Sequence, residues 1–236
     1  MKIMLIELGE FYPGELAIKE QYAKSVCLVD TTTVLKVVEA PSPLPDNFSR
    51  FGLYVPGILN RVKEAEQEEY DAVTVDCFTD SGIESAKIAA NIPVVGPAES
   101  SLHLSCLLAD KFGWITPMEE GIAFHWRQVK AFSLADRITS IKALNISLPD
   151  VFNKKGETEE KIIKLAREMV HEGAQQILIG CTGILPALGT GSANKLSQML
   201  GVTIIDPFAI ALKTAEMLVS LNLCQSKLAF SGTANF

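Results

Sequence analysis

Two of the five cysteines stand at equivalent points of the sequence. Cys77 follows the apolar run at residues 72–75, Cys181 follows the apolar run at residues 176–179, and a short polar turn comes after each. Both thiols are therefore expected at the carboxyl end of a strand, where open α/β sheets bind their ligands. Two thiols that face one substrate can racemise a carbon next to a carbonyl group, because one removes its proton and the other protonates the opposite face.

The segments after these cysteines have helical spacing, so each thiol is expected near a helix N-terminus, where partial positive charge favours the thiolate. Free amides at such a turn can also hold a carboxylate or a developing oxyanion. Gly82 and Gly183 would let the backbone approach a ligand closely. The competing interpretation is that both cysteines are ordinary buried packing residues. The cysteines without this context, which we interpret as structural, are Cys27, Cys106 and Cys224.

Short apolar runs alternate with longer segments of helical spacing along the chain. The expected strands lie at residues 3–6, 25–29 and 35–38 (one weak strand or two pieces of one), 72–75, 93–96, 114–116, 137–143, 176–179 and 202–205. The expected helices lie at residues 54–68, 83–90, 100–111, 157–172, 195–200 and 208–221. This alternation predicts an α/β fold, with mainly parallel sheets that carry helices on both faces.

The order strand, cysteine, polar turn, helix, strand, proline occurs twice. The two cysteines are 104 residues apart, and Pro97 and Pro207, which follow the next strands, are 110 residues apart. Chance is the alternative, since any α/β chain contains strand–turn–helix units. We interpret the pattern as two pseudo-symmetric Rossmann-like domains, each a short sheet flanked by helices. Their expected bounds are residues 1–96 with 207–236, and residues 97–206.

The composition is that of a folded globular protein. The 236 residues are 48% apolar and 21% charged, which is enough for a core and excludes disorder as the main state. A net charge of −7 disfavours nucleic acid as a partner. The three histidines lack zinc-site spacing, and an odd, scattered set of cysteines is unlike a disulfide framework. No apolar stretch is long enough for a membrane span or a signal peptide, so a cytoplasmic location without a membrane partner is expected.

Around the two cysteines the sequence resembles the aspartate/glutamate/hydantoin racemase superfamily, most of all its hydantoin and allantoin racemase branch. The matching segments are Cys-Phe-Thr-Asp-Ser-Gly at 77–82, Pro-Val-Val-Gly-Pro-Ala-Glu at 93–99, Trp-Ile-Thr at 114–116, Gly-Cys-Thr-Gly at 180–183 and Val-Thr-Ile-Ile-Asp-Pro at 202–207. The resemblance covers most of residues 70–220. Both cysteine motifs, in this order and at this spacing, make it specific.

The resemblance implies an active site in the cleft between two pseudo-symmetric domains, and cofactor-independent catalysis by two cysteines. Cys77 and Cys181 would be the acid/base pair. The residues that it implies for substrate binding are Phe78, Thr79, Thr116, Thr182 and Gly183. It implies no metal and no organic cofactor, a small-molecule substrate and a homo-oligomer.

One departure from the family concerns the substrate. Hydantoin racemases carry an Asn-Pro-Asn-Thr-like turn after the first strand, whereas residues 7–11 here read Glu-Leu-Gly-Glu-Phe. If Glu7 or Glu10 faces the site, it repels an anionic substrate unless the carboxylate is protonated or paired. The proline-rich residues 40–45 are expected either as a loop over the cleft or as a surface linker. His125 is expected as a packed residue, with the cleft wall as its less favoured place.

We predict a racemase or epimerase that acts on a 5-substituted hydantoin or a related ureide. Within the same class of enzyme, an aspartate/glutamate-type amino-acid racemase and a maleate-type cis–trans isomerase are the alternatives. A decarboxylase would need only one of the paired thiols. From a different class, a small-molecule binding protein without turnover is the alternative that an intact cysteine pair disfavours.

Overall fold

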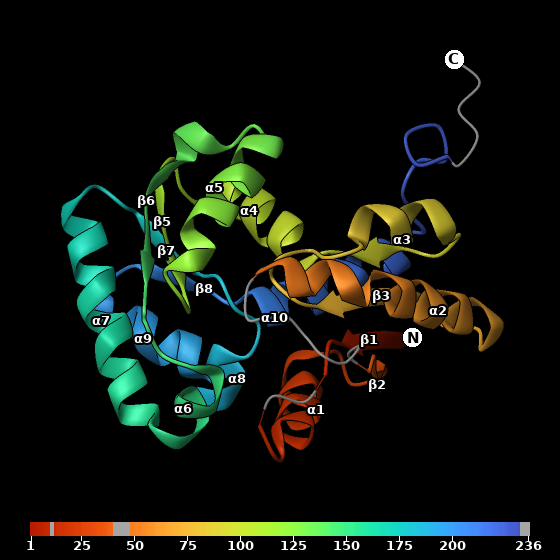
Figure 1. The fold of residues 1–236 in the computed structure, drawn as a ribbon, viewed down its shortest axis with the longest axis horizontal. Helices are drawn as coiled ribbons and strands as arrows, with labels where there is room; N and C mark the ends of the chain where they lie inside the picture. Colours follow the sequence, from red (N-terminus) through yellow and green to blue (C-terminus); the bar gives the residue numbers. More distant parts are fainter. Residues whose placement is uncertain (10–11, 40–47, 232–236) are drawn as a thin grey trace.

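Two parallel four-stranded sheets form the frame of the molecule in this computed structural model, which describes residues 1–9, 12–39 and 48–231 (Figure 1). The first sheet has the strand order β2-β1-β3-β4 and the second the order β6-β5-β7-β8. The strands are β1 (Lys2–Glu7), β2 (Thr32–Val37), β3 (Ala72–Asp76), β4 (Val94–Val95), β5 (Phe112–Thr116), β6 (Ile138–Ala143), β7 (Gln176–Ile179) and β8 (Thr203–Ile205). The second order repeats the first, so the predicted α/β fold with two pseudo-symmetric sheets is confirmed.

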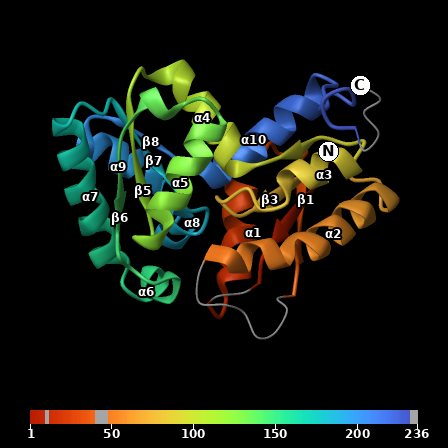
Figure 2. The ribbon, with the colours of Figure 1, turned by 45° about the horizontal axis from the view of Figure 1, so that its top comes forward.

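Helices cover both faces of each sheet. Those packed around the first sheet are α1 (Glu15–Val26), α2 (Val55–Gln67), α3 (Ile83–Ala89) and α10 (Pro207–Ser220), with the 3₁₀ helix η1 (Phe48–Tyr54) before α2. Those around the second are α4 (Pro97–Leu108), α5 (Glu120–Ala131), α6 (Leu148–Asn153), α7 (Lys155–His171), α8 (Ile184–Leu188) and α9 (Ser192–Leu200), with η2 (Ala135–Arg137) before β6. Figure 2 shows α4 and α10 side by side where the two halves meet. Within the described residues, no helix has the length and apolar character that a membrane crossing requires.

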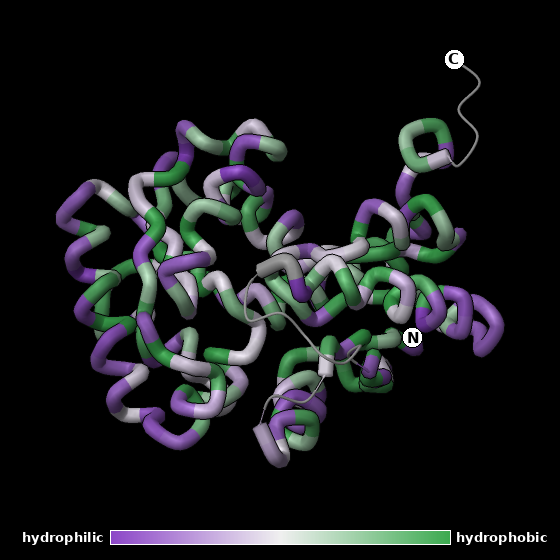
Figure 3. The backbone as a smooth tube through the Cα atoms, in the orientation of Figure 1, coloured by the Kyte–Doolittle hydropathy of each residue, from purple (hydrophilic) through white to green (hydrophobic). Residues whose placement is uncertain are grey.

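The cores follow the alternation of side chains along each strand. In β1, Met4 and Ile6 pack with α2 and α3, whereas Ile3 and Leu5 pack with α1 and α10. In β7, Ile177 and Ile179 pack with α7, α8 and α9 on one face. The opposite face of the second sheet packs on α4 and α5. Apolar segments accordingly lie inside, and the outer turns of α7 are largely hydrophilic (Figure 3).

The first half departs from prediction at residues 25–29. These residues are not a strand, because α1 runs to Val26 and Cys27 caps its carboxyl end. Helix α1 escaped prediction because it buries the charged residues Glu15 and Lys19 as well as Tyr22 and Ala23, so its buried face has no apolar periodicity. Helices α5, α6 and α8 were also not predicted. The proline-rich residues 40–45 and Glu10 lie outside the described residues.

Aspartates hold the two helices at the junction. The carboxylate of Asp80, in the turn after Cys77, accepts the backbone N–H groups of Ala98 and Glu99 at the start of α4, at 2.9 and 2.8 Å. Asp206 caps α10 in the same way and also accepts the hydroxyl of Tyr22 at 2.7 Å. Both helices begin with a proline, which needs no backbone donor there. These caps fix the turn after Cys77 to the second half of the molecule.

Candidate active site

A pocket lies between the carboxyl ends of the central strands of the two sheets. Its wall includes Glu7 at the end of β1 and Asp76 at the end of β3 from the first half, and Thr116 at the end of β5 from the second. Its empty volume, with the open mouth included, is about 790 Å³. Its position is the one where open α/β sheets bind ligands.

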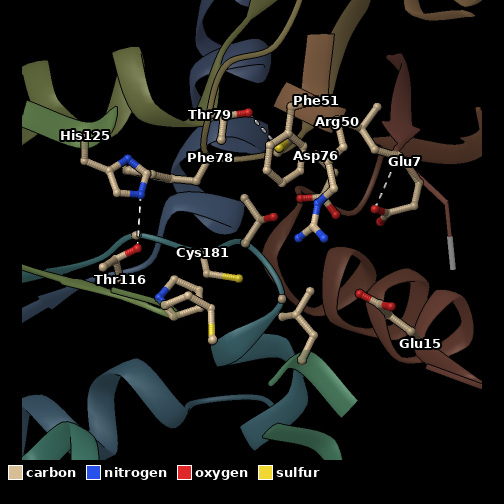
Figure 4. A pocket seen from close by; sticks show the side chains of 18 of the residues that line it. Glu7, Glu15, Arg50, Phe51, Asp76, Phe78, Thr79, Thr116, His125 and Cys181 are labelled. Carbon is tan, nitrogen blue, oxygen red and sulfur yellow. Dashed lines mark hydrogen bonds between the residues drawn. The ribbon is translucent and has the colours of Figure 1, made fainter. Parts of the chain in front are cut away.

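The pocket brings together every residue that the sequence predicted for the site. The lining contains Cys77, Cys181, Phe78, Thr79, Thr116, Thr182 and Gly183. Figure 4 shows Thr79 and Phe78 from one half on one side of the pocket, and Cys181 and Thr116 from the other half on the opposite side. Gly82 is different, because it caps α3 at φ 73° and packs toward Ile58 and Val55 instead of lining the pocket. The catalytic and binding roles of the pocket residues remain predictions.

Each thiol receives hydrogen bonds from the turn that follows it. Cys77 Sγ lies 3.0 Å from Thr79 Oγ1, and that hydroxyl lies 2.6 Å from Ser81 Oγ. Backbone N–H groups also point at the sulfurs, from Thr79 to Cys77 and from Gly183 to Cys181. Such donors stabilise a thiolate, so they supply the means to hold negative charge on either side of the pocket.

The helix N-termini and turns were expected to favour the thiolate form, but burial has the larger effect on both cysteines. Burial raises the pKa of Cys77 to about 12 and the pKa of Cys181 to about 11, because desolvation outweighs the nearby donors. The positive charge of Lys19 acts to lower the pKa of Cys181, whereas Asp76 acts to raise both pKa values. The charge of Lys19 therefore favours the thiolate form at Cys181.

We expect alkylation of Cys181 to follow a pH profile displaced to high pH. A pKa of about 11 instead of 9.0 leaves about a hundredfold less thiolate near neutrality, and only the thiolate reacts. Iodoacetamide labelling between pH 7 and 11, followed by mass spectrometry of the peptides, measures the profile. The exposed Cys224 is the internal reference in the same samples. A Cys181 rate that levels off below pH 9 would contradict the expectation.

A hydrogen-bonded chain sets the orientation of Thr116. Its Oγ1 lies 3.0 Å from His125 Nε2, while His125 Nδ1 lies 3.2 Å from Gln128 Oε1 (Figure 4). Gln128 Nε2 donates to the carbonyl oxygen of Phe78 at 3.2 Å, so its Oε1 is the acceptor for His125. Burial lowers the pKa of His125 to about 4, so the ring is neutral at pH 7 and carries its proton on Nδ1. Thr116 then donates to Nε2, and its oxygen remains able to accept a proton donor from a ligand.

A buried charge cluster forms another part of the wall. Lys19 Nζ lies 2.6 Å from a carboxylate oxygen of Glu7, 3.0 Å from one of Glu15 and 2.8 Å from one of Asp76. Burial raises the pKa of Glu7 well above its usual value, although Lys19 partly offsets this. Burial alone would lower the pKa of Lys19, but the three carboxylates hold it above its usual value. Glu7 therefore lines the pocket as a carboxylate paired with Lys19, at the position where hydantoin racemases carry their Asn-containing turn.

Two glycines next to Cys181 have different roles, and only Gly180 is required by a close approach. A Cβ on Gly180 would lie 1.9 Å from Trp114 Nε1, and Trp114 is fully buried, so no side chain fits there. A Cβ on Gly183 would lie 3.6 Å from Glu15 Oε1 and 3.9 Å from Cys181 Sγ, inside the pocket. The first glycine therefore positions the strand end, and the second keeps room beside the thiol.

Sequence reasoning missed several residues of the wall. Glu15 and Lys19 carry the i,i+4 spacing of a helical ion pair, but their helix was not predicted. Asp76 is a charged residue at the end of an apolar strand, which was a usable signal. Arg50 carried no signal, because it lies in the 3₁₀ helix η1 without any motif. His125 was expected to be packed and is buried, yet it also lines the pocket.

Comparisons with known proteins agree with this geometry. The family model for Asp/Glu/Hydantoin racemase matches residues 46–215. A hydantoin racemase of Paenarthrobacter aurescens is 30% identical over 205 residues, which is 85% of this chain and 84% of that protein. A second hydantoin racemase, from Pseudomonas sp. (strain NS671), is 29% identical over 212 residues, covering 89% of this chain and 82% of that protein.

Solved structures show the same fold. An allantoin racemase from Klebsiella pneumoniae superposes with a TM-score of 0.86 at 22% identity, covering 100% of this chain and 96% of that one. The family model covers more than half of the chain, and the relative from Paenarthrobacter aurescens covers more than two thirds. The chain is therefore an isomerase that belongs to the Asp/Glu/hydantoin racemase family.

Proposed function

We propose that this protein is a cofactor-independent racemase that exchanges the proton at C5 of a 5-substituted hydantoin or a related ureide. The observation that carries the proposal is the position of Cys77 and Cys181. They follow equivalent strands of the two sheets, and both line one pocket. The similarity to proteins that are themselves hydantoin racemases supports the substrate class.

We also infer that residues 1–96 with 207–236 form one domain and residues 97–206 the other, since α10 packs in the first core and α4 in the second.

The chemistry needs one thiolate and one thiol. The charge of Lys19 favours the thiolate at Cys181, so this sulfur removes the C5 proton, and the electron pair of that C–H bond moves into the adjacent carbonyl as an enolate. The Cys77 thiol then donates its proton to the opposite face of C5, and the enolate electron pair returns to form the new C–H bond. Cys77 is left as the thiolate, which accepts hydrogen bonds from the hydroxyl and the backbone N–H of Thr79. The reverse direction begins from that state.

The polar wall suits a cyclic ureide. Such a ring presents N–H donors beside its carbonyl groups, and the oxygen of Thr116 is oriented to accept one of them because its proton points at His125. An aspartate or glutamate zwitterion would bring two carboxylates to a wall where Lys19 is already paired with three, which leaves Arg50 as the cation for them.

Proton NMR in deuterated water tests the proposal. With either enantiomer of a 5-substituted hydantoin, we expect loss of the C5 proton signal and decay of optical rotation to zero at one common rate. Hydantoins racemise slowly without protein, so heat-denatured protein is the matched control. Exchange of the alpha proton of aspartate or glutamate, with none at hydantoin C5, would assign the chain to amino-acid racemisation. No exchange with either class would refute alpha-proton abstraction.

A further inference from the structure

The pocket contains a cation that its acidic neighbours do not neutralise. Arg50 lines the pocket, and Figure 4 shows its guanidinium group projecting into the open space on the side of Cys181. Its Nε is buried and has no hydrogen-bond partner among the described residues. No described carboxylate lies within ion-pair distance of it, although the Phe51 ring centroid lies 5.1 Å from its central carbon.

This arrangement is unusual because the pocket wall is rich in acids. Glu7, Glu15 and Asp76 all direct a carboxylate oxygen at Lys19, so they are engaged away from Arg50. Arg50 is only half-buried, but a buried N–H group without an acceptor, such as its Nε, costs free energy, and the charge has no described carboxylate partner. A ligand that supplies both an acceptor and a negative charge at this point would remove that cost and pair the charge.

We propose that Arg50 is a specificity-determining residue that binds a carboxylate at the end of the substrate's 5-substituent. The inference rests on the proposed hydantoin racemase function and narrows it to hydantoins with an anionic side chain. The planar guanidinium matches a carboxylate with two parallel hydrogen bonds, which a neutral group cannot equal. One unpaired cation corresponds to one carboxylate on the substrate.

The position of Arg50 favours the substituent over the reacting ring. Arg50 comes from η1, whereas the groups that hydrogen-bond the two sulfurs come from the turns after the cysteines. The guanidinium is therefore assigned to the group attached to C5 and not to the reacting ring.

Hydantoin-5-acetate and hydantoin-5-acetamide test this proposal, because they have the same shape and differ in charge. For the wild-type protein we expect kcat/KM for racemisation to be ten- to hundredfold higher with the acetate. Arg50→Gln should lower kcat/KM for the acetate by the same factor, mostly through KM, and change the value for the acetamide less than threefold. Arg50→Lys should retain part of the preference, because it keeps the charge without the planar fork.

Arg167→Gln is the matched control, since Arg167 is exposed on α7 and does not line the pocket. Thermal unfolding checks that each variant is folded, and calorimetric titration of both racemic compounds measures selectivity without turnover. Equal affinities for the two compounds in the wild-type protein, or an equal loss on both in Arg50→Gln, would overturn the role of Arg50. Failure of the proposed function looks different, because C5 exchange would then be absent from neutral hydantoins as well.

Discussion

Replacing Cys77 by alanine is expected to abolish racemisation in both directions while leaving one-sided proton exchange. The reaction needs a proton acceptor on one face and a proton donor on the other, so loss of either thiol removes inversion in both directions. Positioned acid/base groups contribute about 10² to 10⁴ in rate, and we expect a loss of at least about a thousandfold. Cys181 remains able to remove and return a proton on its own face, so one enantiomer should still exchange C5 hydrogen for deuterium without inversion.

Cys181→Ala should show the complementary behaviour, with exchange retained for the opposite enantiomer. Chiral chromatography measures inversion, and proton NMR in deuterated water measures exchange in the same samples. The controls are Cys27→Ala, Cys106→Ala and Cys224→Ala, since none of these cysteines lines the pocket. Racemisation at the wild-type rate by Cys77→Ala or Cys181→Ala would refute the two-thiol mechanism. The mechanism would also be refuted if both variants exchanged the C5 hydrogen of the same enantiomer.

Replacing Lys19 by methionine is expected to cause the largest loss of stability. The substitution leaves Glu7, Glu15 and Asp76 buried without the cation that each of them contacts within 3.0 Å. Removing one partner of a buried ionic group costs about 3 to 5 kcal/mol in the free energy of unfolding. Urea denaturation at pH 7, followed by circular dichroism, measures the loss.

The matched control is Lys161→Met, because both lysines pair with a glutamate four residues earlier on a helix. The Lys19 side chain is 3% exposed and the Lys161 side chain 37%, so the control should lose less than about 1 kcal/mol. Lys19 lowers the pKa of Glu7, so its removal raises that pKa further, and protonation of the carboxyl then recovers part of the lost stability. The deficit of Lys19→Met should therefore shrink as the pH falls from 7 toward 5. Similar losses in both variants would contradict a buried-charge origin.

Much of the frame could be predicted because its signals are local. Short runs of three or four residues predicted β1, β3, β5 and β7, and helical spacing predicted α2, α7 and α10. The recurrence of Cys77 and Cys181 after matching strands predicted that each thiol lies at the carboxyl end of a strand, and the family resemblance implied that the two meet in a cleft between the sheets. Helix α1 was missed for the opposite reason, since its buried positions are partly charged and have no apolar period.

The charges of the site were beyond prediction because their state depends on what folds around them. The sequence did not show whether Glu7 faces the site. The fold brings it together with Lys19, which is twelve residues away, and with Asp76 at the end of β3. The proposed role of Arg50 depends on the tertiary structure, because only there do the nearby carboxylates pair with Lys19 and not with Arg50.

The two thiols show most clearly which properties the sequence determines and which the tertiary structure determines. The residue order determined which cysteines lie at equivalent strand ends, together with the turns and amide donors that follow them. Their protonation was decided by the tertiary structure, because burial is produced by both halves of the molecule and raises the pKa of Cys77 and Cys181 more than the local donors lower it. Strand ends and turns depend on neighbouring residues, whereas desolvation depends on every segment that closes over the site.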